Sequence, residues 1–110
     1  MFTPHDDSGY TTPVEGIEMK TLVHGEKTLL TRFKLTRGAI LPAHAHPNEQ
    51  TGYLVSGKIR LHMGDEVYDV GPGDAWCIAP DMTHRAEIIE DSVAVEVFSP
   101  VRKDYLPDPK

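Results

Sequence analysis

The chain has 110 residues, a formal net charge of −6, 39% hydrophobic residues and 25% charged residues. This length allows one domain with a single core, and the composition excludes a collagen-like or wholly disordered chain. The acidic balance makes nucleic acid and anionic membrane surfaces poor partners, because both favour a basic face.

Membrane insertion and secretion are not indicated by the sequence. No apolar run approaches the roughly 20 residues that a bilayer-spanning helix needs, and the first ten residues lack the basic start and apolar core of a secretion signal. The single cysteine, Cys77, cannot form an intrachain disulfide, and its apolar surroundings predict a small buried side chain. We therefore expect a cytoplasmic protein.

The ends of the chain are predicted to flank one domain, which spans residues 14–103. Residues 1–13 contain three Pro or Gly residues among small polar ones, which predicts a flexible N-terminal arm. Residues 104–110 contain Pro107 and Pro109 and predict a C-terminal tail.

Short segments between these ends have the composition of strands. Apolar and polar side chains alternate in most of them, and Gly, Pro and Asp mark the breaks. No stretch of 12 or more residues has a convincing helical period. The pattern predicts an all-β antiparallel sandwich or barrel, and a closed barrel leaves an interior able to hold a ligand. The segments, in chain order, are residues 17–23, 29–36, 58–63, 66–70, 75–79, 84–89 and 93–98.

Six histidines occur in the chain, and two of them have a spacing that suits metal ligands. His5, His24 and His62 are expected to be exposed polar residues. His44 and His46 lie two residues apart on an extended segment, so both side chains project from the same face. Their Cα atoms would lie about 7 Å apart, close enough for both imidazoles to reach one ion. Alone, this spacing is weak evidence for a metal site.

The residues around this pair resemble the two motifs of the cupin superfamily. Residues 38–57 read Gly, five residues, His-x-His, three residues, Gln, six residues, Gly, which matches the first motif except that the family has Glu where this chain has Gln50. Residues 73–84 begin with Gly-Asp and end with His84 like the second motif, with Asp81 in place of the usual Gly. The resemblance covers roughly residues 28–99.

This resemblance implies a double-stranded β-helix, the jelly-roll barrel of the cupins, with one divalent metal ion inside. Carried over, the ligands are His44, His46, His84 and a fourth from the glutamate position. Gln50 occupies that position, and we favour it over Glu49, which would face the opposite side of a strand as a surface carboxylate. The ion could be Zn, Ni, Fe, Mn or Cu, since imidazole suits several of them.

A glutamine in the ligand set has chemical consequences. Three neutral imidazoles and a neutral amide leave the 2+ charge of the ion uncompensated, which favours strong polarisation of a bound hydroxyl or carboxylate. Without an anionic ligand the ion should also resist oxidation to the trivalent state. The ligand set therefore favours binding or acid–base catalysis over redox oxygen chemistry, and it favours anionic ligands.

The C-terminal part of the chain narrows the resemblance. Residues 90–106 resemble the tail of the pectin-degradation cupins of the KdgF type, whose pattern is close to Asp-x-Phe-Ser-Pro-x-Arg-x-Asp-Tyr, and residues 44–53 fit the same group. The resemblance implies conversion of 4,5-unsaturated monouronates to the linear 5-keto form, a homodimer, and catalytic roles for Glu96, Phe98 and Arg102. Glu96 stands where the group has Asp.

The residues of the last strand allow two arrangements without this analogy. Val93, Val95 and Val97 are expected to form the apolar packing face, so that Glu96 and Phe98 share the other face. That face lines the barrel interior, where an unpaired carboxylate is costly unless it is functional, or it points to solvent.

The favoured hypothesis is a metal-dependent enzyme that acts on a small anionic sugar acid. Arg102 would clamp the substrate carboxylate, unless it is a surface side chain, while Phe98 would pack on the carbon skeleton and Glu96 would transfer a proton. Tyr105 is expected to pack the tail rather than to take part in chemistry. The alternatives are a metal-dependent binding or sensing domain without turnover and, less favoured, a cupin dioxygenase.

Overall fold

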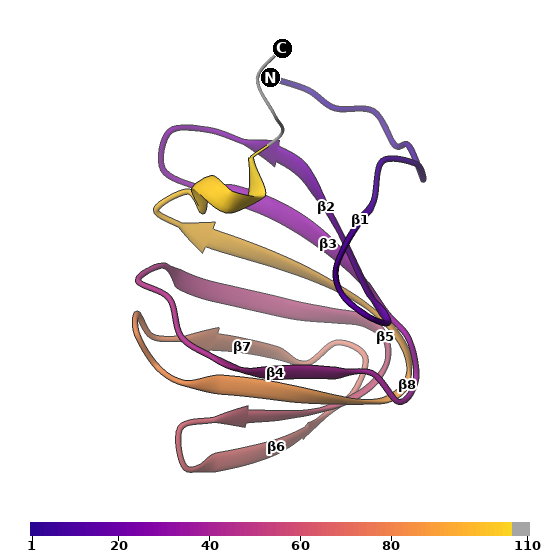
Figure 1. The fold of residues 1–110 in the computed structure, drawn as a ribbon. Helices are drawn as coiled ribbons and strands as arrows, with labels where there is room; N and C mark the ends of the chain where they lie inside the picture. The colour runs from indigo at the N-terminus through magenta and orange to yellow at the C-terminus, as the bar shows by residue number, and fades with distance from the viewer. Residues whose placement is uncertain (107–110) are drawn as a thin grey trace.

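The computed structural model describes residues 1–106, which form antiparallel strands and one short 3-10 helix (Figure 1). The prediction of an all-β fold is confirmed. No helix within these residues has the length and apolar character needed to cross a membrane. The elements are β1 (Thr11–Val14), β2 (Ile17–His24), β3 (Leu29–Leu35), β4 (Ile40–His44), β5 (Glu49–Met63), β6 (Glu66–Val70), β7 (Ala75–Ile78), β8 (His84–Ser99) and η1 (Lys103–Tyr105).

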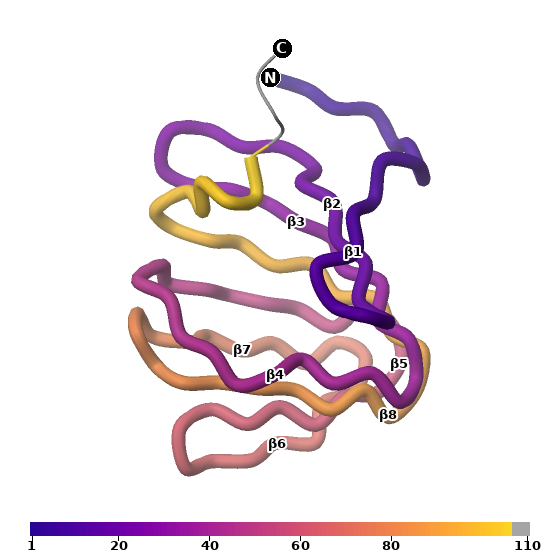
Figure 2. Tube along the Cα trace, in the orientation of Figure 1, coloured from indigo at the N-terminus to yellow at the C-terminus, as the bar shows by residue number. Residues whose placement is uncertain are grey.

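Two long strands, β5 and β8, pair with each other and connect the two layers of the molecule. The first part of β5 pairs with β7 and with the end of β8, which continues to β3, β2 and β1. The second part of β5 pairs with β6 and with the start of β8, which also pairs with β4. Both strands bend at the same side of the molecule, and the Cα trace follows this bend (Figure 2).

The bend depends on a glycine that approaches the neighbouring strand closely. Gly57 has a φ of 93°, and a Cβ on it would lie 2.1 Å from Ser92 Oγ, so no other residue fits without a shift of the backbone. Ser92 Oγ accepts a hydrogen bond from Lys58 N at 3.0 Å and donates one to Glu90 O at 2.7 Å. These bonds fix the two bent strands against each other.

The barrel interior takes the even-numbered side chains of β8, which corrects one prediction. Ala94 and Phe98 are buried, whereas Val93, Val95 and Val97 are only partly buried and lie on the opposite face. The prediction that the valines form the core face is therefore wrong. The inward set at the start of β8, which includes Ala86 and Ile88, continues with the same alternation through the bend, and this alternation overrides local hydrophobicity. The buried core comprises Ile17, Met19, Leu29, Phe33, Leu54, Ile59, Leu61, Val70, Ala86, Ile88, Ala94 and Phe98.

Cys77 is exposed, so the prediction of a buried cysteine is also wrong. Its neighbours Trp76 and Ile78 both line the interior cavity. Because side chains alternate along β7, Cys77 must face outward.

The terminal segments contact the layer that contains β2 and β3. Lys34 forms an ion pair with Asp7 at 2.7 Å, and Arg32 Nε donates to Tyr10 Oη at 2.6 Å. At the other end, η1 lies beside β2 (Figure 2), where Thr21 Oγ1 donates to the carbonyl of Tyr105. Of the predicted tail at 104–110, residues 107–110 lie outside the described residues. The division into arm, domain and tail stays a prediction.

Candidate metal centre

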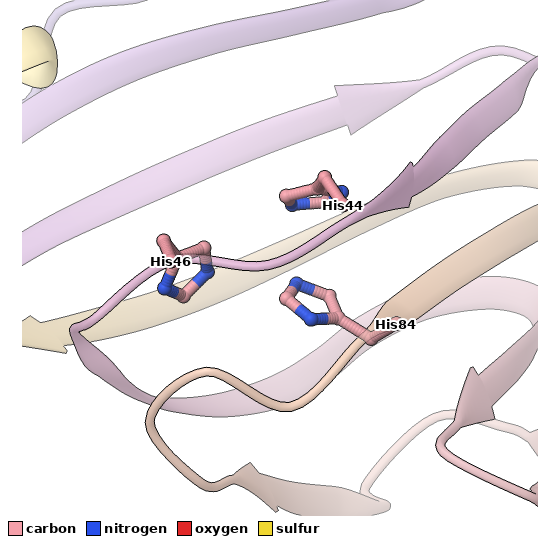
Figure 3. Close-up of side chains that lie close together, drawn as sticks. All are labelled: His44, His46 and His84. Atoms are coloured by element: carbon pink, nitrogen blue, oxygen red, sulfur yellow. The ribbon is translucent and has the colours of Figure 1, made fainter.

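Three imidazoles from two distant segments meet in the barrel. His44 ends β4, His46 follows it, and His84 begins β8, where it is the register partner of His44. The ring centroids lie 4.2 Å apart for His44 and His84, 5.0 Å for His46 and His84, and 5.7 Å for His44 and His46. One nitrogen of each ring lies within 4.8 Å of the others, and Figure 3 shows the side chains turned toward one another.

Backbone carbonyls determine which nitrogen of each ring carries the proton. The Nδ1 atoms of His44, His46 and His84 lie 2.8, 3.0 and 2.9 Å from the carbonyl oxygens of Pro42, Asn48 and Met82. A carbonyl only accepts hydrogen bonds, so each Nδ1 must donate. The proton therefore sits on Nδ1, and Nε2 keeps a lone pair, as in imidazoles that bind metals.

Within residues 1–106 no protein group donates a hydrogen bond to these Nε2 atoms, and this makes a cation a fitting partner for them. His84 Nε2 is buried without a hydrogen-bond partner among residues 1–106. His46 Nε2 lies 2.9 Å from Gln50 Oε1, so two acceptors face each other. Burial lowers the pKa of His46 and lowers that of His84 to about 4, which keeps both rings neutral at pH 7. A divalent ion would satisfy these lone pairs at once.

Gln50 and Glu49, which are neighbours on β5, differ in burial and in the side of the strand that they face. Gln50 is 5% exposed and faces the imidazoles, whereas Glu49 is exposed on the other side of β5. The amide of Gln50 donates through Nε2 to Glu96 Oε1 at 2.7 Å, which leaves its oxygen toward His46. The geometry thus supports the preference for Gln50, although its role as a ligand stays a prediction.

Glu96 and Phe98 lie on the interior face of β8, beside this cluster. Glu96 Oε1 accepts hydrogen bonds from Gln50 Nε2 and, at 3.2 Å, from Trp76 Nε1. Burial raises the pKa of Glu96 to about 7. Phe98 is 1% exposed and packs edge-on against His46, with ring centroids 5.7 Å apart. Of the two arrangements left open by the sequence, the structure has the interior one.

Arg102 reaches the same cavity from the segment after β8. Its guanidinium lies 3.9 Å from the centroid of the Tyr105 ring and 5.2 Å from that of Phe98. Nη2 and Nε donate to the two carboxylate oxygens of Asp104 at 2.7 and 3.2 Å. The Arg102 side chain is 14% exposed and lines the cavity with Glu96, so it is not a freely solvated surface arginine.

Several residues beside the site were not assigned to it from the sequence, although Tyr105 was expected to pack the tail. Trp76 donates to Glu96, and Tyr105 lines the cavity as well as packing against Phe98. Asn48 accepts from His46 through its carbonyl and donates through Nδ2 to Pro100 O at 2.6 Å. These contacts depend on strand register, and no local motif announces them.

Other predicted positions have clear placements. Asp81, at the position where the motif usually has Gly, has a φ of 65° and donates its backbone N–H to His46 O at 2.8 Å. Asp tolerates this left-handed conformation better than most residues. His5 is exposed as expected, His24 is partly buried, and His62 is partly buried and bonded to Glu87 at 2.7 Å. None of these three histidines joins the cluster within the part of the chain that the structure describes.

The fold and the three imidazoles together define a small antiparallel β-barrel protein with a candidate metal centre inside it. Residues 31–100 match the family described as the cupin domain, Cupin_2. This match spans more than half of the chain, and the chain belongs to the cupin family.

Similarity to two KdgF proteins extends over nearly the whole chain. It is 26% identical to pectin degradation protein KdgF of Dickeya dadantii (strain 3937) over 106 residues, which cover 94% of this chain and 92% of that protein. The structure of KdgF from Halomonas sp. has a TM-score of 0.90 and 30% identity, covering 96% of this chain and all of that one. Oxalate decarboxylase OxdC of Bacillus subtilis (strain 168) is 26% identical over 80 residues, which are 21% of its length.

Proposed function

We propose that this cupin converts 4,5-unsaturated monouronates to the linear 5-keto form with the help of one divalent metal ion. One observation carries the proposal: His44 and His84 of the three-imidazole cluster line one cavity together with the Glu96 carboxyl and the Arg102 guanidinium. The similarity to a protein named for pectin degradation, and to the structure of another KdgF, supports a sugar acid as the substrate.

His44, His46, His84 and Gln50 would hold the metal ion. When bound there, the ion would act as a Lewis acid that polarises a substrate oxygen. The protein supplies the remaining contacts. Arg102 would bind the substrate carboxylate through the N–H groups that Asp104 does not use, and Phe98 would pack on the carbon skeleton.

Glu96 would transfer protons during the reaction. The reaction is an isomerisation with no change in composition: the bond between carbon 1 and the ring oxygen breaks as the hemiacetal hydroxyl loses a proton and the ring oxygen gains one, which gives an aldehyde and an enol. The enol hydroxyl then loses a proton and carbon 4 gains one, which gives the ketone. Glu96 suits this exchange because its Oε1 is held by two donors, while Oε2 forms no hydrogen bond within residues 1–106.

The test is loss of the ultraviolet absorbance of unsaturated galacturonate or guluronate on addition of the purified protein. We expect turnover that a chelator abolishes and that added divalent metal restores. Glu96→Gln should lower kcat by at least about 100-fold, the contribution of a general acid–base. Glu49→Gln, one residue from Gln50 but exposed, is the matched control and should match wild type.

Two results would contradict this function. Turnover that persists in a metal-free sample would remove the metal from the mechanism. Tight metal-dependent binding of the uronate with no loss of absorbance would indicate a binding or sensing domain instead.

We also propose a homodimer formed through the outer face of β5. Tyr53 and Val55 are 47% and 49% exposed there, and Tyr53 is the register partner of the outward-facing Val95. Sedimentation velocity at micromolar concentration should give the mass of a dimer, and Tyr53→Glu should give a monomer because it buries a charge in an apolar contact. A monomeric wild-type protein contradicts this proposal.

A further inference from the structure

A row of three residues crosses the interior next to the imidazoles. Gly52 on β5 is the register partner of Trp76 on β7 and of Glu96 on β8. A Cβ on Gly52 would lie 2.2 Å from Cε2 of the Trp76 indole, so the indole occupies the space that a side chain would take. Because Gly52 leaves this space, the indole N–H reaches across to Glu96.

Two hydrogen bonds, one from within this row and one from Gln50, end on the same carboxylate oxygen of Glu96. Gln50 Nε2 and Trp76 Nε1 both donate to Oε1 of Glu96, at 2.7 and 3.2 Å. An oxygen that accepts two N–H groups has no room for a proton of its own. Any proton that Glu96 carries therefore sits on Oε2, and Oε1 remains an acceptor in both protonation states.

The two ends of the Gln50 amide differ strongly toward a cation. The oxygen can coordinate a metal ion, whereas the NH₂ group presents two protons and repels it. A rotation of the amide by half a turn exchanges the two ends with almost no change in shape. A glutamate at this position would need no such control, because both of its ends are oxygens.

We propose that Glu96, fixed by the Trp76 indole over Gly52, is a positioning residue that turns the amide oxygen of Gln50 toward the three imidazoles. This inference rests on the metal site of the proposed function and adds a device that makes a glutamine serve as a ligand. It is separate from proton transfer, which uses the other oxygen of Glu96.

The experiment measures Zn²⁺ affinity of the full chain by competition with a chromophoric chelator, so that it does not depend on turnover. Glu96→Leu cannot accept a hydrogen bond and should bind Zn²⁺ about 10-fold more weakly, the usual cost of losing a partner that orients a ligand. Glu96→Gln still offers an oxygen to both donors and should stay within about two-fold of wild type. The decisive variant is Q50E/E96L, which should regain at least wild-type affinity because a carboxylate needs no orientation.

Trp76→Phe keeps a ring over Gly52, loses only the N–H, and serves if Glu96→Leu fails to fold. It should weaken Zn²⁺ binding by about three-fold, and this loss should vanish in the Gln50→Glu background. The inference is overturned if Glu96→Leu, or Trp76→Phe in its place, binds Zn²⁺ as tightly as wild type, or if Gln50→Glu fails to remove the loss. A wild-type protein that binds Zn²⁺ but does not turn over the uronate contradicts only the proposed reaction, and one that binds no Zn²⁺ contradicts both.

Discussion

The two ends of the barrel interior are built from opposite kinds of residue. At the bend end, where β5 and β8 turn from one layer to the other, the interior residues Leu54, Ile59 and Ile88 are 0–3% exposed and apolar. At the histidine end, where β8 begins, His84 and Gln50 are almost as deeply buried, at 2% and 5%. Burial of the two ends is thus similar, while their polarity is not.

This contrast indicates which end stabilises the fold and which carries the chemistry. Apolar burial at the bend end contributes favourably to folding. Polar burial at the histidine end costs free energy wherever a group stays unpaired, as His84 Nε2 does among the described residues. A protein accepts such a cost where function requires it. Substitutions at the two ends should therefore give separable effects.

His84→Ala should have the largest effect, and only on metal binding. Removing one imidazole of three should weaken Zn²⁺ affinity by at least about 100-fold, more than the loss of an orienting partner. The metal-free protein should unfold at the same temperature or a higher one, because a buried unpaired nitrogen is removed. Chelator competition and thermal unfolding measure the two effects. His62→Ala, on the outer face, is the control for Zn²⁺ binding. If both variants lost the same Zn²⁺ affinity, the histidine end would not be the metal site.

Leu54→Ala should affect only stability. Leu54 is fully buried in the core, and its truncation should lower the free energy of unfolding by about 3 kcal/mol in urea titrations. Zn²⁺ affinity of the folded fraction should stay within about two-fold of wild type. The neighbouring Val55, 49% exposed, should lose less than about 0.5 kcal/mol when changed to Ala. Comparable losses at the two positions would mean that the bend end is not the stabilising core.

The histidine end could be predicted from the sequence to a greater extent than the core could. The spacing of His44 and His46 and the motif ending in His84 predicted the three imidazoles that the structure brings together. The period of two along a strand predicted that Gln50 and Glu49 face opposite sides, which they do. These signals lie within short segments of the sequence, so they can be identified without knowledge of the fold.

The core prediction failed where tertiary structure decides. Three valines at alternate positions of β8 are a stronger local apolar signal than Ala94 with Phe98, yet the latter face inward. Cys77 lies in an apolar run but is at an outward-facing position of β7. The contact between Trp76 and Glu96 requires the register of three strands, since Gly52 lies between them. Local hydrophobicity specifies none of these registers.

Arg102→Lys should separate two properties of the histidine end, substrate binding and metal binding. Lysine keeps the charge but lacks the planar fork that binds carboxylates through two parallel hydrogen bonds. We expect KM for the uronate to rise about 10-fold with little change in kcat, and Zn²⁺ affinity to stay the same. Steady-state kinetics with Lys103→Ala, an exposed neighbour, as control checks this. A fall in kcat at constant KM would instead assign Arg102 to the chemical step.

Gly52→Ala should give the smallest effects, and it should give them at both ends, because Gly52 lies between Leu54 and Gln50 on β5. The added Cβ would overlap the indole of Trp76, whose displacement should cost about 1 kcal/mol of unfolding free energy and weaken Zn²⁺ binding by about three-fold. Trp76 is the chain's single tryptophan, so the intrinsic fluorescence reports its displacement directly. Gly25→Ala is the matched control, since a Cβ there meets nothing within 4 Å. An unchanged emission spectrum with unchanged Zn²⁺ affinity would contradict this prediction. It would mean that the indole adapts to the added Cβ and keeps its hydrogen bond to Glu96.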